Sequence, residues 1–427
     1  MTRTGEHPPG EWISITSLTR LWEILRTTFW IVPAVSVVGS IGVAAGFVAL
    51  DHHVGHIHSF LFYPGPPSGA RSFLSSIVTS MITVTGTVFS VSVLVLQLTN
   101  TQFSSRAIRM YLRDLTVQAT LGLFMATFVY AMVVQRSVAG GSAGGFVPRV
   151  SVSVAFLFVL ASVALFIRYI SHISDMVRVA TIVKTLSQES RRLLERRYPA
   201  DCSPRRRSPS LPHEMFVVGA PHPGVLVDLN ERRLVQIAEE SDCILAIHVR
   251  VGDFLPEGAP LCRVHRDISD GDRWDDDEVR SLEARLLRAI ALDSERTMEQ
   301  DLAFGFRQLV DIAEKALSPS LNDPTTATQC LDSIHDLLRR LAGRYLPDGL
   351  SHDGDGHLRL VIPQYSFSDY LEVALAEIWL YGRDGAQIRN RMSSMLADLE
   401  QVALPEHRSA VSRWRSRLAE AAPADVA

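Results

Sequence analysis

The sequence is nearly without lysine. Its 42 Lys and Arg residues include two lysines, Lys184 and Lys315, so arginine carries almost all of the positive charge. Because no lysine lies between these two positions, no cofactor can be attached through a lysine amine in that stretch. The net charge of −4 also lacks the basic character that is typical of nucleic-acid-binding proteins.

Cysteine is scarce as well, and all four cysteines lie after the last long apolar run: Cys202, Cys243, Cys262 and Cys330. None has the CxxC spacing of a zinc knuckle. This usage indicates reduced thiols in a cytosolic compartment. The sequence also shows no glycine-rich phosphate loop, no HExxH motif and no set of nucleophile, base and orienting acid. We therefore expect no enzymatic activity and no cofactor.

Charge is almost absent from the long apolar runs. Four runs have the length of roughly 20 residues that a hydrocarbon core requires: Phe29–Leu50, Ser72–Leu98, Leu115–Val134 and Val150–Ile170. The first run is too long for a signal-peptide core, so this span is expected to stay in the mature protein. A proton-coupled transporter is disfavoured, because such transporters usually need a carboxylate inside the membrane.

The distribution of arginine predicts the orientation of the spans. Arginines gather in segment 1–28 and between the second and third spans, at Arg3, Arg20, Arg26, Arg106, Arg109 and Arg113. The other two connections carry arginine only at their edges, at Arg71, Arg136 and Arg149. We therefore expect a multi-pass protein of the bacterial inner membrane with both termini in the cytoplasm.

The second span carries a stripe of polar side chains. At helical spacing, one face collects Ser72, Ser76, Ser80, Thr83, Thr87, Ser90 and Gln97. Hydroxyl groups and small residues allow helices to pack closely, and they also line polar pathways. Helix packing and a pore lining are therefore both open interpretations.

The connection after the first span is rich in histidine: His52, His53, His56 and His58. Imidazole groups titrate near neutral pH and are common metal ligands. The only nearby carboxylate is that of Asp51, and the connection has no cysteine. Metal binding or pH sensing is thus an alternative to an ordinary solvated loop.

The chain changes character after residue 172. Apolar residues at helical spacing predict that the fourth span continues as a stalk, with a proline-rich linker completing residues 173–212. Short β runs then predict a small module over residues 213–268. Its segment "VGDFLPEGAPLCRV" resembles the barrel-sandwich modules of lipoyl and biotinyl carriers, but the missing lysine favours a structural role.

An acidic run follows the β module: Asp267, Asp270, Asp272, Asp275, Asp276, Asp277 and Glu278. It lacks the ligand spacing of an EF-hand. We interpret it as a solvated turn that leads into a helix, because acidic residues favour helix starts.

A helical domain is predicted over residues 269–420, ahead of a disordered tail at 421–427. Two of its helices meet at a corner, where Asp323 can cap and Pro324 fits the first helical position. Polar residues gather in sequence around this corner: Arg296, Gln300, Asp301, Arg307, Asp311, Ser318, Asn322 and Asp323. They are interpreted as a ligand site or as a structural network.

A hairpin is expected near residues 351–363, where "SHDGDGHLRLVIP" contains two Asp-Gly pairs. The side chains of His352, Asp353, Asp355 and His357 are of metal-binding type. Turn formation explains the aspartates more simply.

Three segments carry a resemblance to a known family. "RTMEQDLAFGFRQLVDIAEKALSPSLNDPTTA", "VSVLVLQLTNTQFSSRAIRMYLRD" and "LGLFMATFVYAMVV" resemble the bacterial predicted membrane proteins of domain of unknown function 2254. The resemblance runs from the first span to "EIWLYGRDGAQIRNRM". It implies a membrane location and a fold, but no established activity, ligand or catalytic residue.

Together these patterns predict a mainly α membrane protein, with a four-helix transmembrane domain followed by a cytoplasmic α+β domain of a small β module and a helical bundle. The favoured function is a homo-oligomeric ion channel or pore-like transporter with a cytoplasmic regulatory domain. The alternative is a membrane-anchored sensor or interaction module. Anchoring alone does not need four spans or a continuous hydroxyl face. The expected partners are the lipid bilayer, further copies of the chain and ions, without nucleic acid.

Overall fold

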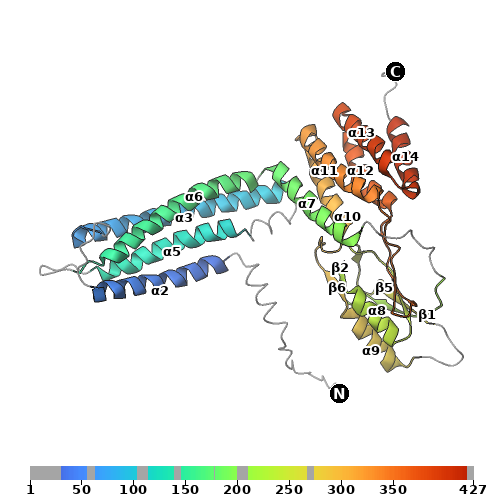
Figure 1. Ribbon diagram of the computed structural model, residues 1–427, viewed down its shortest axis with the longest axis horizontal. Helices are drawn as coiled ribbons and strands as arrows, with labels where there is room; N and C mark the ends of the chain where they lie inside the picture. The colour runs from blue at the N-terminus through green and yellow to red at the C-terminus, as the bar shows by residue number, and fades with distance from the viewer. Residues whose placement is uncertain are drawn as a thin grey trace, which may run out of the picture. The chain divides into compact units, whose positions relative to one another are not determined.

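The computed structural model describes residues 30–54, 63–102, 114–138, 146–176, 178–199, 210–266 and 274–420. They belong to two compact units that divide between Arg178 and Val179. Both units are rich in helices, and the strands belong to the second (Figure 1). The segment 1–28, the arginines between the second and third spans, and the tail 421–427 lie outside the described residues.

The first unit contains four long helices (Figure 1): α2 (Ile31–Val54), α3 (Pro67–Gln102), α5 (Leu115–Ser137) and α6 (Arg149–Met176). Each is long and apolar enough to cross a membrane, which confirms the four predicted spans. Helix α5 packs against the other three. Accordingly, 61% of its apolar window is buried, against 17–22% in the other helices. The four spans therefore pack around α5.

Charged side chains at the ends of these helices satisfy backbone groups of neighbouring helices. Asp51, near the end of α2, accepts two backbone N–H groups in the first turn of α6, at 3.0 and 2.9 Å. Arg71 of α3 donates to the carbonyl of Val138 at the end of α5, at 2.6 Å. Asp114 caps the start of α5 and lies 2.8 Å from Nε2 of His172. The signs of Asp51, Arg71 and Asp114 match the helix dipoles that they face.

The second unit contains a group of packed helices (Figure 1): α7 (Val179–Arg197), α10 (Leu302–Leu317), α11 (Pro324–Ala342), α12 (Phe367–Gly382), α13 (Ala386–Val402) and α14 (Pro405–Glu420). The predicted continuous stalk is wrong, because α6 ends at Met176 and a separate helix begins at Val179. Helix α7 buries an apolar face that includes Ile182 and Leu186, and it packs on α10 and α11. It is therefore part of the core of the second unit.

Two small sheets complete the second unit. The larger has the order β1 (His213–Gly219), β5 (Pro260–Arg266), β3 (Ile244–Ile247), β8 (Leu358–Val361) and β7 (Leu350–His352). Its pairs are antiparallel except for β3 with β8. The smaller has the order β4 (Phe254–Leu255), β2 (Gly224–Leu229) and β6 (Ile290–Asp293). Helices α8 (Glu231–Glu240) and α9 (Asp276–Leu287) join the same region.

This β region is larger than the predicted module of residues 213–268. Strands β6, β7 and β8 come from later in the chain. In the parallel pair, Leu245 lies opposite Leu360, and both side chains are fully buried. Burial of apolar surface therefore draws a distant segment into the sheet, which local β patterning does not indicate.

Two predicted local features are present in the second unit. Asp275 caps α9 in a capping box with Glu278, so this part of the acidic run starts a helix. Asp267, Asp270 and Asp272 lie outside the described residues. Strands β7 and β8 form the predicted hairpin, in which Gly356 has a φ of +85°.

Candidate functional site

The polar stripe of the second span lies on the exposed face of α3. Ser72, Ser76, Ser80, Thr83, Thr87, Ser90 and Gln97 are all exposed in the single chain. Thr79 is exposed too and lies on the same side. The opposite face of α3 buries Leu74, Ile77 and Met81 against the other helices. The unit therefore buries one apolar face of this helix and exposes its polar stripe together with apolar side chains that include Ile82, Phe89 and Leu94.

The hydroxyl groups of this face bond to their own helix. Ser76, Thr83, Thr87 and Ser90 each donate to the backbone carbonyl four residues earlier, at 2.9–3.0 Å. Their hydrogen atoms are then occupied, and each oxygen keeps acceptor capacity. The exposed face can accept hydrogen bonds from water or contact a cation, and it can also pack against another helix.

Within the described residues, the histidines at the end of the first span form no metal site, and His52 and His53 lie in the last turn of α2. The ring of His52 stacks on that of Phe146, with centroids 3.9 Å apart. Nδ1 of His53 lies 3.0 Å from the carbonyl oxygen of Ala49. His56 and His58 lie outside the described residues. The two described histidines therefore have local structural contacts, and metal binding by all four stays a prediction.

The polar residues predicted around the helical corner do not lie at one place. They are spread along α10, whose 16 residues span about 24 Å. Arg296, Gln300 and Asp301 lie before its start, Arg307 and Asp311 lie within it, and Ser318, Asn322 and Asp323 follow its end. The structure therefore separates these eight residues into three groups.

The first group is built around a buried carboxylate. The side chain of Asp301 is 1% exposed, and one of its oxygens lies 2.5 Å from Nε of Arg296. Its other oxygen accepts the backbone N–H of Phe304 at 3.0 Å and so caps α10. Burial raises the pKa of Asp301, and the attraction of Arg296 opposes this rise.

Residues from neighbouring loops pack around Asp301 and Arg296. Gly252 has a φ of +97°, and a Cβ atom there would lie 2.1 Å from Oδ2 of Asp301. The guanidinium of Arg250 lies over the ring of Tyr365, 4.6 Å from its centroid. Burial raises the pKa of Tyr365, and the charge of Asp301 adds to this effect. Gln300 lies apart from this contact, because it bonds to Asp228 and to the backbone of Leu229.

The second group surrounds one arginine. Nε of Arg307 lies 2.7 Å from Oδ1 of Asp311, and Nη1 lies 2.6 Å from Oε1 of Glu377 in α12. Nη2 lies 3.7 Å from Oε2 of Glu314. Oxygens of the three acids approach within 4.8 Å of one another, so these residues could hold a cation. Arg307 already places a positive charge among them.

The three acids of this group differ in their protonation behaviour. The hydrogen bond from Arg307 lowers the pKa of Glu377. Burial, together with the nearby charge of Glu377, raises the pKa of Glu314. Burial also raises the pKa of Asp311, against the attraction of Arg307. The pKa of Glu377 is therefore shifted in the opposite direction to the pKa values of Asp311 and Glu314.

The third group is the corner between α10 and α11. Asp323 accepts the backbone N–H groups of Thr325 and Thr326, both at 3.1 Å, and the hydroxyl of Thr326 at 2.6 Å. The hydrogen bond from Thr326 lowers the pKa of Asp323. Asn322 has a φ of +45°, and its N–H donates to the carbonyl of Ser318 at 2.9 Å. These contacts are those of a helix cap with a tight turn.

Asp353, one of the hairpin residues of metal-binding type, makes hydrogen bonds within the turn. Asp353, whose side chain is 2% exposed, accepts backbone N–H groups of Asp355 and His357 at 3.1 and 2.8 Å. Nε of Arg359 donates to it at 2.7 Å and lowers its pKa to about 2. These contacts fit the turn interpretation of Asp353.

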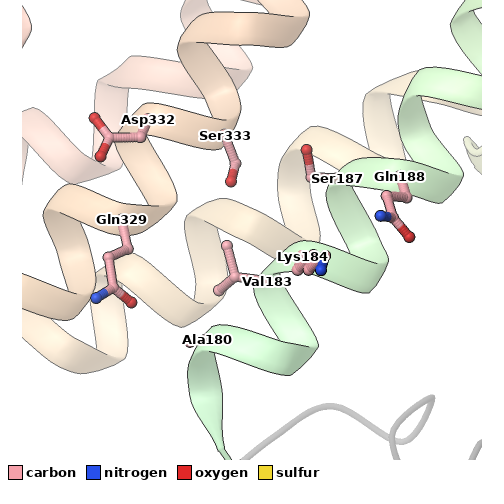
Figure 2. Close-up of a pocket in the computed structure, with 8 residues that line it drawn as sticks. All are labelled: Ala180, Val183, Lys184, Ser187, Gln188, Gln329, Asp332 and Ser333. Carbon is pink, nitrogen blue, oxygen red and sulfur yellow. The ribbon is translucent and has the colours of Figure 1, made fainter.

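A groove of about 340 Å³ lies between α7 and α11 (Figure 2). Its wall contains Lys184, Ser187 and Gln188 from α7, facing residues of α11 that include Asp332. Asp332 is paired with Arg391 at 2.5 Å. All of the polar side chains in this wall are at least partly exposed to solvent.

The sequence did not indicate Glu377, Tyr365 or Arg250 as partners of the polar groups. Glu377 reaches Arg307 from a helix 70 positions later in the chain. Tyr365 and Arg250 lie in connections between elements. No local spacing links these residues, because their contacts depend on which helix faces and loops meet in the folded unit.

Comparison with known proteins identifies the family. A model of the family described as "Predicted membrane protein (DUF2254)" matches residues 26–398. The chain is 31% identical over 412 residues to the uncharacterized proteins Rv1290c of Mycobacterium tuberculosis and Mb1321c of Mycobacterium bovis, an overlap that covers 95% of this chain and 78% of each relative. No solved structure matches. The chain is therefore a membrane protein that belongs to the family of domain of unknown function 2254.

Proposed function

We propose that this protein is a homo-oligomeric ion channel or pore-like transporter of the bacterial inner membrane, in which the polar face of α3 lines the path. Both termini lie in the cytoplasm, and the second unit regulates the pore. The protein is not an enzyme and uses no cofactor. Its partners are the bilayer, further copies of the chain and the permeating ions.

One observation carries this proposal: the polar stripe of α3 is exposed in the single chain, while a different face of the same helix, with Leu74, Ile77 and Met81, is buried against the other helices. Polar groups are costly in hydrocarbon, although back-bonded hydroxyl groups reduce that cost. Covering the stripe with further copies removes it from lipid. A closed ring of such copies would place the same face of α3 around one axis.

The chemistry of this face suits a passive path. Four of its hydroxyl groups use their hydrogen atoms within the helix and keep acceptor capacity on oxygen. The described residues of the stripe carry no ionised side chain. A path lined in this way can replace part of the hydration shell of an ion without binding the ion too tightly to release it.

The test combines assembly with flux. Thr83→Val and Thr87→Val remove a hydroxyl from the exposed face while keeping a β-branched side chain of similar size. We expect the oligomer to remain assembled and ion flux in reconstituted liposomes to fall. The matched control is Thr85→Val, because Thr85 makes the same type of backbone hydrogen bond but is half-buried on the other side of α3.

Accessibility supplies a second measurement. Cysteines at Ser76, Ser80, Thr83 and Thr87 should react with small water-soluble thiol reagents, while a cysteine at Thr85 should react less. Purified protein that passes no ions over a range of ion types, pH and tension would contradict the pore. In that case the membrane-anchored interaction module becomes the better explanation of the four spans.

A further inference from the structure

A small cleft between α8 and α9 is lined by arginine. Its volume is about 250 Å³, and its wall consists of Arg233, Arg285, Arg288 and Ala289. Arg233 lies in the first turns of α8, Arg285 lies in the last turn of α9, and Arg288 caps the end of α9. Three arginines from these two helices thus line one cleft, where Arg233 and Arg288 are exposed and Arg285 is half-buried, and its wall contains no acid.

A chain of hydrogen bonds holds two of these arginines. Arg233 Nη1 donates to Oε1 of Gln236 at 2.8 Å, and Nε2 of Gln236 donates to Oε1 of Glu240 at 2.8 Å. The other oxygen of Glu240 accepts from Arg285. These hydrogen bonds join α8 to α9 and orient the guanidinium groups of Arg233 and Arg285 in the unliganded protein. This lowers the entropy lost on binding.

The third arginine is held by its own helix. Nε of Arg288 donates to the carbonyl of Ala284 at 3.0 Å, and its terminal nitrogens have no described acceptor. Within the described residues, neither Arg233 nor Arg288 has a carboxylate within 4.0 Å. Most other arginines of this unit, among them Arg263, Arg307 and Arg391, are paired with an acid.

The charge balance of the cleft indicates its ligand. Three arginines face one acid, Glu240, so this group of side chains carries a net charge of +2. A phosphate group with two ionisable oxygens carries about −1.5 to −2 near pH 7. Guanidinium groups match phosphate oxygens because their N–H donors lie in a planar fork. We propose that this cleft binds a phosphate group.

The size of the cleft limits what else the ligand can contain. Pockets for drug-sized molecules enclose about 300–1,000 Å³, and this cleft is smaller. It therefore accepts the phosphate while the rest of any larger molecule stays outside. Inorganic phosphate and the phosphomonoester headgroup of a lipid such as phosphatidic acid both meet this requirement.

The experiment uses the full chain in phosphatidylcholine nanodiscs. Inorganic phosphate is titrated by calorimetry at constant ionic strength. We expect saturable binding, and we expect Arg233→Gln and Arg288→Gln each to weaken it by about tenfold, since each removes one charge-assisted contact. Arg280→Gln is the matched control, because Arg280 also lies on α9 but pairs with Asp277 outside the cleft wall.

A second preparation, with phosphatidic acid in the nanodiscs, separates the two sources. If added phosphatidic acid suppresses the binding of inorganic phosphate, the lipid headgroup occupies the cleft. If it leaves that binding unchanged, the ligand is soluble phosphate. Both results support the site. Two results would overturn it: an absence of saturable phosphate binding in phosphatidylcholine, or equal affinities in the wild type and the double variant Arg233→Gln with Arg288→Gln.

Discussion

Asp301 and Asp323 cap consecutive helices, but their surroundings differ. Asp323 is exposed and accepts three hydrogen bonds from Thr325 and Thr326. Asp301 caps α10 through one backbone N–H, is almost fully buried and contacts Arg296. By the number of hydrogen bonds, replacing Asp323 should lower the free energy of unfolding more than replacing Asp301. Burial predicts the opposite order.

The expected losses follow from these contacts. Asp323→Ala removes an exposed cap and should cost about 1 kcal/mol. Asp301→Ala removes a cap and also leaves the part-buried guanidinium of Arg296 without its carboxylate. Removing one partner of a buried pair costs about 3–5 kcal/mol. Because the Arg296 side chain is 27% exposed and can recover some hydration, we expect a total near the lower end, about 3 kcal/mol.

Thermal unfolding of the full chain in detergent measures this difference. In a unit of about 250 residues, each 1 kcal/mol shifts the midpoint by about 2–4 °C. Asp323→Ala should therefore lower the midpoint by about 2–4 °C and Asp301→Ala by about 6–12 °C. Tryptophan fluorescence reports on the second unit, because Trp379 and Trp414 are buried in α12 and α14.

Asp301→Asn serves as the matched variant, since an amide oxygen can still accept the backbone N–H of Phe304. It should lose less stability than Asp301→Ala. Equal losses of stability in Asp301→Ala and Asp323→Ala would refute the reasoning that burial of the carboxylate makes its loss more costly. A variant of Asp323 that keeps its stability but changes ion flux would instead indicate a ligand site at the corner between α10 and α11.

Two further predictions concern orientation and acid stability. Ser68 is exposed near the start of α3, and Ser174 is exposed near the end of α6. A cysteine at Ser68 should react with an impermeant thiol reagent added outside whole cells, while a cysteine at Ser174 should not. The reverse pattern would invert the proposed orientation. Arg359 lowers the pKa of Asp353 to about 2, so the stability that this contact contributes is present above about pH 4 and is lost as the pH falls toward 2. Between pH 5 and pH 3, roughly the start of this window, the melting temperature should fall less steeply in Asp353→Asn than in the wild type or in the control Asp355→Asn; equal slopes in all three would contradict this role for Asp353.

The sequence by itself determined the features that depend on local periodicity and length. Four apolar runs of sufficient length and almost without charge predict four spans, because a helix must satisfy its own backbone in hydrocarbon. Asp323 before Pro324 predicts a helix start, since a side-chain cap and a fixed φ act within one turn. The Asp-Gly pairs likewise predict the turn between β7 and β8.

Only the tertiary structure decided which of these elements meet. Strand β8 pairs with β3 more than 100 residues earlier, and Glu377 reaches Arg307 from another helix. The polar face of α3 was visible in the sequence, but its exposure depends on the packing of α3 against α5. Such contacts arise from apolar faces that become buried together, and the pairing of faces is a property of the whole unit.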